Sequence, residues 1–547
     1  MKKFLFLIPM AALAISATFY QTGDPAEAPK NWFNLSYKND GTHGVGTERT
    51  YNELLNGKKG DTVIVAVIDG GVDYKHEDLK NVMWHNPGEI PGNKIDDDKN
   101  GYVDDVYGWN FIGGANGENV EHDNLELTRE YRRLKKKFKG KTKEDLPASD
   151  TGEYTRYLGI QTDYNAKYDD AKKTLDNIKD FDKSLTGLYN EIKAKTGKDT
   201  VTYDDFVNHS PSQQYSRFHA ILKLLVVKKP EDLTGLNAEI KEGLEAYNNM
   251  LDYHLNTDYD PRSIVGDNYD DATEKYYGNP DIKGPDAFHG THVSGIIAAQ
   301  RGNGIGIDGI ANTVLIMGVR VVPDGDERDK DVANGIIYAV DNGAKIINMS
   351  FGKAYGYNKA AVDKAVKYAE SKGVLLVHAA GNDSKNNDVT NNFPTARYED
   401  GGVASNWIEV GALNWQGGKN APAPFSNYGK KNVDVFAPGV DIHSCKPENG
   451  YADASGTSMA SPVTAGVCAV LKSYFPNLSA TDIKRIVENS SDKSLAGKKV
   501  NIPGQFKVNK KGKVKKAITG KFSTLSKTGG VVDLYAAVQM ASGNPAK

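Results

Sequence analysis

The sequence has little cysteine and no excess of charge of either sign. Only two cysteines, Cys445 and Cys468, occur among 547 residues, so the chain has no disulfide framework. Cys468 lies in the apolar run AGVCAVL and is expected to be a buried small residue, while a bond between the two cysteines stays open. The 68 basic and 71 acidic residues give a net charge of −3, and this balance gives no reason to expect nucleic acid or an anionic membrane as a partner.

Long hydrophobic runs are also missing, apart from the first stretch, MKKFLFLIPMAALAISATFYQ. Its two lysines, its apolar centre and the small residues at 16–18 predict a signal peptide over residues 1–19, although an uncleaved anchor is an alternative. The run is short for a membrane span, and no cysteine near it could carry a lipid. We therefore expect a soluble mature protein that is secreted or periplasmic, with an N-terminal extension over residues 20–60.

Short apolar runs rich in β-branched residues alternate with helical patterns from residue 61 onward. Runs of this kind, bounded by Gly, Asp or Asn, are typical of strands buried on both faces. Strands are predicted at 62–69, 314–322, 344–350 and 373–382, and helices at 289–300, 331–342, 358–372 and 459–474. The alternation predicts an α/β fold in which a parallel β-sheet is flanked by helices on both sides. We expect this domain to comprise residues 61–119 and 261–495.

Residues 120–260 depart from the alternation, because they are charged, rich in tyrosine and lysine, and mostly helical in period. Phe181, Leu185, Leu188 and Ile192 recur at steps of four, three and four, which is typical of one apolar helix face. The cost of closing a loop grows only logarithmically with its length, so a large surface insertion is tolerated. The segment is predicted to be a helical insertion, and its role stays open.

The C-terminal stretch, residues 496–547, begins with a basic segment. The run KVNKKGKVKK at 507–516 predicts an exposed hairpin within residues 496–530, since basic runs of this length are usually solvated surface. The run VVDLYAAVQMA at 531–541 then predicts a closing amphipathic helix.

Polar residues stand at the ends of three predicted strands. Asp69 ends the first strand, Ser350 ends the third and Asn382 closes the fourth. Ligand and catalytic groups of parallel sheets gather where strands end, at their carboxyl edge. Each of the three could be a turn residue when considered alone, but together they indicate one shared site.

The stretch SGTSMASP at 455–462 places Ser458 near the start of a helix that is small or apolar on every side. Such a helix is expected in the core, with Pro462 still close to its first turn. Unpaired N–H groups and the helix dipole at this end would stabilise an oxyanion. For an isolated serine, a helix N-cap is the commoner interpretation.

A nucleophilic serine needs a base and a group that orients this base. The stretch FHGTHVSGIIAAQ at 288–300 supplies His289 and His292, and VIDGGVD at 67–73 supplies Asp69, which could accept an imidazole N–H. The two histidines could instead be metal ligands of a metallohydrolase. The HExxH spacing is absent and no third ligand is obvious, which disfavours that alternative.

The stretches VIDGGVD, HGTHVSG, AAGN and GTSMASP, in this order, closely resemble the four signature stretches of the subtilisin-like serine proteases, the subtilases. The resemblance covers roughly residues 61–120 and 265–490. It implies a serine endopeptidase that acts on polypeptide substrates, with Asp69 as triad acid, His289 as general base and Ser458 as nucleophile. Asn382 would donate to the oxyanion together with the Ser458 backbone N–H.

The same resemblance implies that two segments line the substrate cleft: Ser350, Phe351 and Gly352 in one, and Ala379, Ala380 and Gly381 in the other. A catalytically inactive peptide-binding protein on this fold is the remaining rival, and the intact triad disfavours it. The oligomeric state stays open, with a monomer favoured.

The chain departs from the family pattern in three respects. Gly70 follows Asp69 where the family more often has Ser or Thr, and the insertion makes the distance from Asp69 to His289 unusually long. Only about forty residues separate the predicted signal from the first strand, which is short for the usual inhibitory propeptide. The means by which activity is restrained stays open.

A second motif, IDDDKNGYVDD at 95–105, predicts a structural calcium site. Oxygen ligands at alternating positions before a glycine turn can surround one hard cation. The expected ligands are Asp96, Asp98, Asn100, the Tyr102 carbonyl and Asp104. The match to an EF-hand loop is partial, because Tyr107 occupies the twelfth position where a glutamate is usual, and a merely acidic loop is the alternative.

Overall fold

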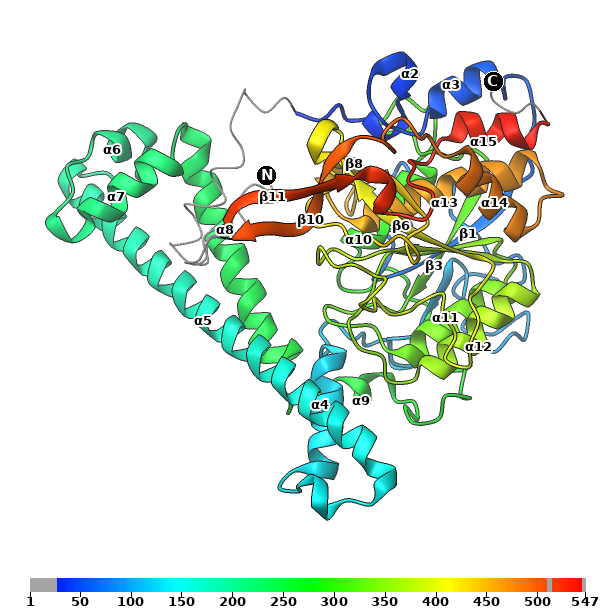
Figure 1. The fold of residues 1–547 in the computed structure, drawn as a ribbon, viewed down its shortest axis with the longest axis horizontal. Helices are drawn as coiled ribbons and strands as arrows, with labels where there is room; N and C mark the ends of the chain where they lie inside the picture. The colour runs from blue at the N-terminus through cyan, green and yellow to red at the C-terminus, as the bar shows by residue number, and fades with distance from the viewer. Residues whose placement is uncertain (1–26, 509–513, 544–547) are drawn as a thin grey trace. The chain divides into compact units, whose positions relative to one another are not determined.

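A computed structural model describes residues 27–508 and 514–543, which form two compact units (Figure 1). The larger unit holds residues 27–126 and the chain from residue 260 onward, and the smaller holds residues 127–259. The predicted signal peptide, residues 1–19, lies outside the described residues.

A seven-stranded sheet forms the centre of the larger unit. Its strand order is β2-β3-β1-β4-β5-β6-β7, and every neighbouring pair is parallel. The sheet strands are β1 (Val63–Asp69), β2 (Gly108–Asn110), β3 (Val314–Arg320), β4 (Ile346–Met349), β5 (Leu375–Ala379), β6 (Trp407–Leu413) and β7 (Val435–Pro438).

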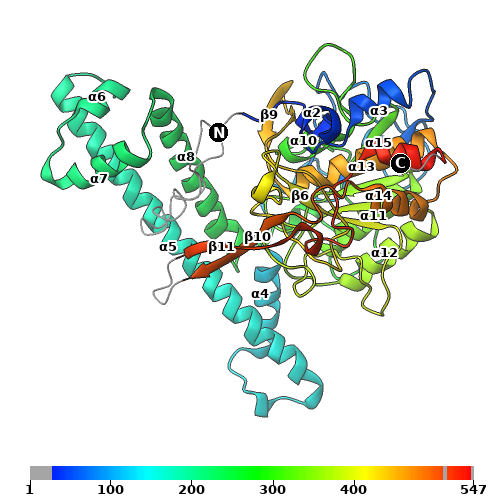
Figure 2. The ribbon, with the colours of Figure 1, turned by 45° about the horizontal axis from the view of Figure 1, so that its top comes forward.

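Helices cover both faces of this sheet, with α11 and α12 on one face and α10 and α13 on the other (Figures 1 and 2). The helices of the larger unit are α2 (Tyr37–Asp40), α3 (Thr47–Glu53), α9 (Arg262–Val265), α10 (Phe288–Ala298), α11 (Asp329–Asp341), α12 (Lys359–Ser371), α13 (Thr457–Tyr474), α14 (Ala480–Ser490) and α15 (Leu534–Ala541).

The alternation of side chains along β1 explains why helices are needed on both faces. Val65 and Val67 pack into the core beneath α10 and α13, whereas Ala66 and Ile68 pack into the core beneath α11 and α12. All four side chains are fully buried. Successive strand residues point to opposite faces, so a continuous apolar run requires cover on both. The predicted α/β fold class is therefore confirmed.

The first described residues belong to the core of the larger unit. Trp32 and Phe33 are fully buried, and the indole N–H of Trp32 donates to the carbonyl of Val440 at 3.0 Å. Further along this segment, the Tyr51 hydroxyl donates to the carbonyl of Ile310 at 3.1 Å. The part of the predicted N-terminal extension from Trp32 onward is thus built into the larger unit.

The smaller unit is helical. It contains α5 (Thr151–Thr196), α6 (Tyr203–Asn208), α7 (Gln213–Leu225) and α8 (Pro230–Asn249), while α4 (Glu126–Phe138) begins at the boundary between the units. The predicted apolar face of α5 is confirmed, because Leu185, Leu188 and Ile192 are buried against α6, α7 and α8, with Phe181 packed beside them. The helical insertion between the Asp69 and His289 segments is confirmed as part of the fold.

Two antiparallel hairpins complete the larger unit. The first joins β8 (Ile442–Lys446) to β9 (Gly450–Ala454), and the second joins β10 (Lys499–Val508) to β11 (Val514–Lys521). The predicted closing helix is α15. Cys445 and Cys468 are both free and buried, and burial raises the pKa of each thiol.

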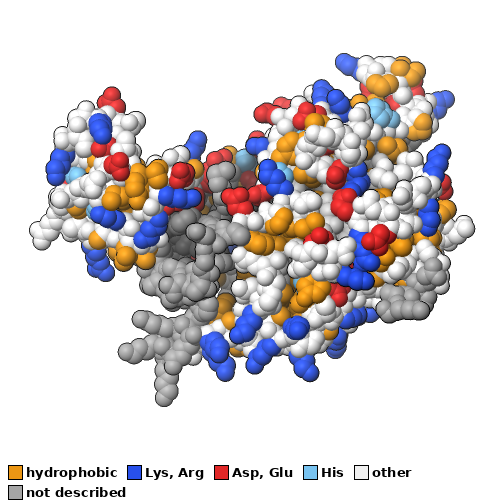
Figure 3. Space-filling view, turned by 90° about the horizontal axis from the view of Figure 1, so that it is seen from above, with side chains coloured by type: hydrophobic (Ala, Val, Ile, Leu, Met, Phe, Trp, Pro, Cys, Tyr) orange, Lys and Arg blue, Asp and Glu red, His pale blue; other side chains and the backbone are white. Residues whose placement is uncertain are grey.

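On the face drawn in Figure 3, acidic and basic side chains are interspersed. None of the helices in the described part of the chain combines the length and the apolar character that a membrane crossing requires.

Candidate active site

The strand order brings the three polar strand ends to one edge of the sheet. Strand β1 pairs with β4, and β4 pairs with β5, all in parallel. Asp69 is the last residue of β1, Ser350 directly follows β4, and Asn382 lies three residues beyond β5. Parallel neighbouring strands end on the same side, so these residues occupy one carboxyl edge as predicted.

Asp69 and His289 form the central polar contact of this edge. Oδ1 of Asp69 lies 2.7 Å from Nδ1 of His289 and also accepts the Gly70 N–H at 2.7 Å. Asp69 is only 2% exposed, whereas the His289 side chain is 41% exposed. The carboxylate therefore places the imidazole proton on Nδ1, and leaves Nε2 as the basic nitrogen.

Gly290 explains how α10 comes so close to Asp69. A Cβ on Gly290 would lie 2.2 Å from the carbonyl oxygen of Gly71, so only glycine permits this approach. The departure at Gly70 is also visible, because this residue offers a backbone N–H but no hydroxyl. The second carboxylate oxygen of Asp69, Oδ2, is buried and has no hydrogen-bond partner among the described residues.

Ser458 is the second residue of α13 and is held against Ser350. Its Oγ donates to the Ser350 carbonyl at 3.0 Å, and the Ser350 hydroxyl donates to the Ser458 carbonyl at 2.9 Å. Pro462 lies in the second turn of the helix, slightly deeper than predicted. Proline has no N–H to donate to the carbonyl four residues earlier, which here is the Ser458 carbonyl. The Ser350 hydroxyl donates to that carbonyl instead.

Asn382 is oriented by Thr457, the first residue of α13. The side-chain oxygen of Asn382 accepts the Thr457 N–H at 2.8 Å and the Thr457 hydroxyl at 3.0 Å. Because this oxygen is already hydrogen-bonded, the amide nitrogen of Asn382 faces the turn at Gly456. A Cβ atom added to Gly456 would lie 3.5 Å from this nitrogen. The backbone N–H of Ser458 has no acceptor among the described residues, so two donors are available in this turn.

The two predicted cleft segments differ in how their backbones are used. In the Ala379–Gly381 segment, side-chain amides donate to the carbonyls of Ala379 and Ala380. Gly381 donates its N–H to Thr457 and accepts from the Asn427 N–H. In contrast, the described residues form no backbone hydrogen bond with Phe351 or Gly352.

Sequence reasoning missed the asparagines that support the Ala379–Gly381 segment. Asn392 donates to the Ala379 carbonyl at 3.0 Å, and Asn387 and Asn427 each donate to the Ala380 carbonyl at 2.9 Å. The side chain of Asn392 also packs against Gly352, where a Cβ would lie 2.6 Å from it. The only signal in the sequence is that these loops are rich in asparagine.

His292 and His289 contact different groups, although both belong to α10. His292 is fully buried, and its Nε2 lies 3.0 Å from the carbonyl oxygen of Ala452 in β9. His289 contacts Asp69 from the same helix. The two imidazoles therefore serve different partners, which disfavours the metallohydrolase alternative.

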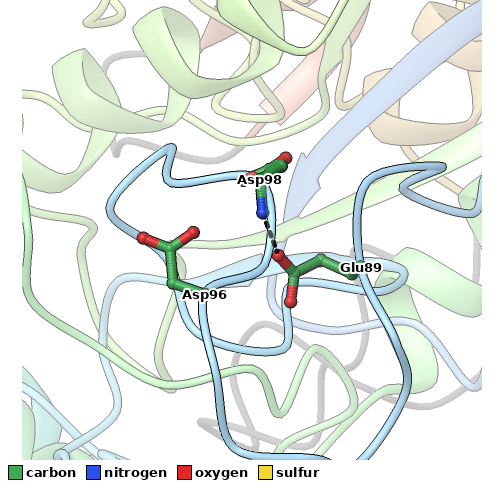
Figure 4. Close-up of side chains that lie close together, drawn as sticks. All are labelled: Glu89, Asp96 and Asp98. Atoms are coloured by element: carbon green, nitrogen blue, oxygen red, sulfur yellow. Dashed lines mark hydrogen bonds between the residues drawn. The ribbon is translucent and has the colours of Figure 1, made fainter.

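The acidic loop, which we define as residues 89–105, brings three carboxylates close together. Sequence reasoning missed one of them, Glu89. Glu89, Asp96 and Asp98 each place one oxygen within 4.8 Å of the others (Figure 4). Among the residues that the structure describes, they are the one set of acidic, histidine or cysteine side chains with this spacing. Glu89 stands before the motif, where the EF-hand pattern has no ligand, so no spacing rule would find it.

Two of the remaining predicted ligands, Asp104 and Asn100, are hydrogen-bonded within the loop. The Asp104 carboxylate accepts the N–H groups of Gly92 and Lys94 at 2.8 and 2.7 Å. The side-chain oxygen of Asn100 accepts the Tyr102 N–H at 2.8 Å, and its amide donates to Asp105 at 3.1 Å. Burial raises the pKa of Asp105 to about 6.

Comparison with known proteins identifies the family. The sequence model of the subtilase family matches residues 60–510. The chain belongs to this family. As a subtilase, it carries a serine-type endopeptidase domain, in agreement with the resemblance seen in its four motifs.

Thermitase of Thermoactinomyces vulgaris is 40% identical to this subtilase over 236 residues, which is 42% of this chain and 78% of that protein. A thermophilic serine proteinase of Bacillus sp. (strain AK1) is 43% identical over 206 residues, which is 38% of this chain and 47% of the relative. The match thus spans about half the length of the thermophilic serine proteinase. A cold adapted subtilisin-like serine proteinase of known crystal structure has 31% identity and a TM-score of 0.33, with 40% of this chain and 72% of that chain covered.

Thr457→Val is expected to lower kcat/KM by about tenfold, because it removes one of the two hydrogen bonds that orient the Asn382 amide. Thr457→Ser keeps the hydroxyl and serves as the matched control. Steady-state hydrolysis of a peptide substrate measures both variants. A valine variant as active as the wild type would show that Asn382 needs no help from this hydroxyl.

Proposed function

We propose that this subtilase is an exported serine endopeptidase that hydrolyses polypeptides through an acyl-enzyme intermediate. The observation that carries the proposal is the 2.7 Å contact between Asp69 Oδ1 and His289 Nδ1 at the same sheet edge as Ser458. A buried carboxylate that fixes the tautomer of a half-exposed histidine, at the same sheet edge as a serine at a helix N-terminus, is suited to acyl transfer.

In the proposed reaction, Ser458 is the nucleophile. Its Oγ turns from the Ser350 carbonyl toward Nε2 of His289, which takes the hydroxyl proton as Oγ bonds to the carbonyl carbon of the scissile peptide. Asp69 stabilises the imidazolium that results. His289 then gives this proton to the leaving amine. A water molecule, activated by the same nitrogen, hydrolyses the ester and restores the Ser458 hydroxyl.

The negative charge of the tetrahedral intermediate would lie on its former carbonyl oxygen. The amide nitrogen of Asn382 and the backbone N–H of Ser458 are the proposed donors to this oxygen. The orientation of the Asn382 amide is set before the reaction, because Thr457 holds its side-chain oxygen in place. Preorganised donors of this kind each contribute about 10²–10³ to kcat.

The proposed substrate cleft lies between Ser350–Gly352 and Ala379–Gly381. The free backbone groups of Phe351 and Gly352 are suited to pairing with an extended polypeptide. Since the backbone of Ala379–Gly381 is largely satisfied within the protein, we assign this segment the role of a wall against which a substrate side chain packs.

We also propose that the acidic loop binds a structural Ca²⁺ through Glu89, Asp96 and Asp98. The three carboxylates offer the hard oxygen donors that this ion prefers, and they lie close enough together to bind one ion. Glu89 would supply the acidic ligand that the motif lacks at Tyr107. The bound ion would neutralise the loop and fix its conformation.

The predicted signal peptide supports export to the periplasm or the medium. The substrates are polypeptides in that compartment, and a monomer is the proposed active form.

Ser458→Ala is expected to lower kcat for casein cleavage by about 10⁶-fold while the fold survives, since the change removes only the nucleophilic hydroxyl. Ser455→Ala, in the same motif, is the matched control and keeps activity, because its hydroxyl contacts Asp441. Circular dichroism reports folding. Full residual activity in the Ser458 variant would end the assignment.

Calcium at 100 times its Kd is expected to raise the Tm of the wild type by about 3 °C relative to a chelator, because the ion binds only the folded loop. Glu89→Gln should abolish most of this shift, whereas Asp104→Asn should retain it. Differential scanning calorimetry measures all three proteins. An equal Tm with calcium and with chelator in the wild type would refute the site.

A further inference from the structure

Lys353 follows the Ser350–Gly352 segment directly, and its side chain is buried among carboxylates. Its Nζ lies 2.8 Å from Glu126 Oε2 and 2.7 Å from Asp329 Oδ1. It also donates to the backbone carbonyl of Glu327 at 2.7 Å. The Lys353 and Glu126 side chains are each 1% exposed. Replacing a buried ion pair by an apolar pair often costs little stability, so the geometry that this arrangement imposes is the feature of interest.

The backbone of Lys353 is fixed as well. Its N–H donates to the Phe393 carbonyl at 3.0 Å, and the Phe393 N–H donates to the Lys353 carbonyl at 2.8 Å. At the other end of the segment, Ser350 exchanges two hydrogen bonds with Ser458. Phe351 and Gly352 are thus held from both sides, while their own N–H and C=O groups form no hydrogen bond with the described residues.

The two carboxylates that hold Lys353 come from separate helices. Glu126 is the first residue of α4, the helix with which the chain leaves the larger unit, and Asp329 is the first residue of α11. Asp329 also accepts the N–H groups of Tyr357 and Asn358 at 2.8 and 2.6 Å. The ammonium of Lys353 therefore connects the end of the cleft segment to two rigid elements.

We propose that Lys353 is a positioning residue for substrate recognition. Its ion pairs with Glu126 and Asp329 hold Phe351 and Gly352 in the extended form that pairs with the backbone of a polypeptide substrate. The inference rests on the proposed endopeptidase function. Without these pairs the segment must be ordered at each binding event, so extended substrates bind more weakly, while the chemistry at Ser458 is unchanged.

The sequence offers a matched control in Lys330. Its side chain is 3% exposed, and its Nζ lies 2.7 Å from Asp267 Oδ2 and 2.8 Å from Glu274 Oε2. It also donates to the Asn268 carbonyl at 2.6 Å. Both lysines therefore bind two carboxylates and one carbonyl in the same unit, but only Lys353 adjoins the cleft segment.

The test compares Lys353→Met and Lys330→Met with the wild type on two substrates. One is an internally quenched octapeptide, and the other is the ester of a single acylated amino acid, which cannot pair along the segment. Titration with a fluorophosphonate gives the concentration of active enzyme. For Lys353→Met we expect the octapeptide KM to rise by about tenfold, with kcat and the ester kcat/KM within about twofold of the wild type.

Lys330→Met should lower Tm without changing the ratio of octapeptide to ester kcat/KM. An unchanged ratio in Lys353→Met, or an equal change in both variants, would overturn the proposal.

If Lys353→Met does not fold, Glu126→Gln is the variant that tests the proposal. Glutamine keeps the shape of the glutamate side chain, and Asp329 remains as an ion-pair partner of Lys353. There the octapeptide KM should rise about threefold, and an unchanged KM would overturn the proposal. A wild type inert toward the ester and the fluorophosphonate would refute the proposed function instead.

Discussion

The hydrogen bond between Asp69 and His289 is the interaction on which the proposed chemistry depends. It joins two segments that are 220 positions apart in the sequence, across 2.7 Å. The carboxylate is buried at the end of β1, and the imidazole belongs to the first turn of α10, a helix that approaches closely because Gly290 has no side chain. A buried acceptor of this kind keeps one ring nitrogen protonated and leaves the other to act as a base.

The parallel sheet explains why such distant segments converge. Its neighbouring strands end at one edge, so Asp69, Ser350 and Asn382 meet there although loops and helices separate them. The insertion leaves this arrangement intact, since a long loop costs little more entropy to close than a short one. The buried Arg328 holds the chain where the insertion begins and ends, because it contacts the buried Asp123 and the half-exposed Asp260 together.

The sequence predicted the sheet edge well, because apolar runs mark β1, β3, β4 and β5 and one polar residue marks each relevant end. It did not predict three strands of the sheet: β2 and β7, which have only three and four residues, and β6, whose apolar pattern is interrupted by Glu409. Glu89 and the asparagines behind Ala379–Gly381 were missed for another reason. Their roles arise from contacts between loops, and no periodicity or spacing within one segment encodes such contacts.

Covalent labelling tests the central claim most directly. The protein is treated with a fluorophosphonate at neutral pH, digested with a second protease and analysed by mass spectrometry, with His289→Ala processed in parallel. The account predicts one adduct, on the peptide that contains Ser458, and almost none in the variant, because the hydroxyl then has no base. An enzyme that cleaves peptides while its Ser458 stays unmodified, or that labels equally well without His289, would contradict it.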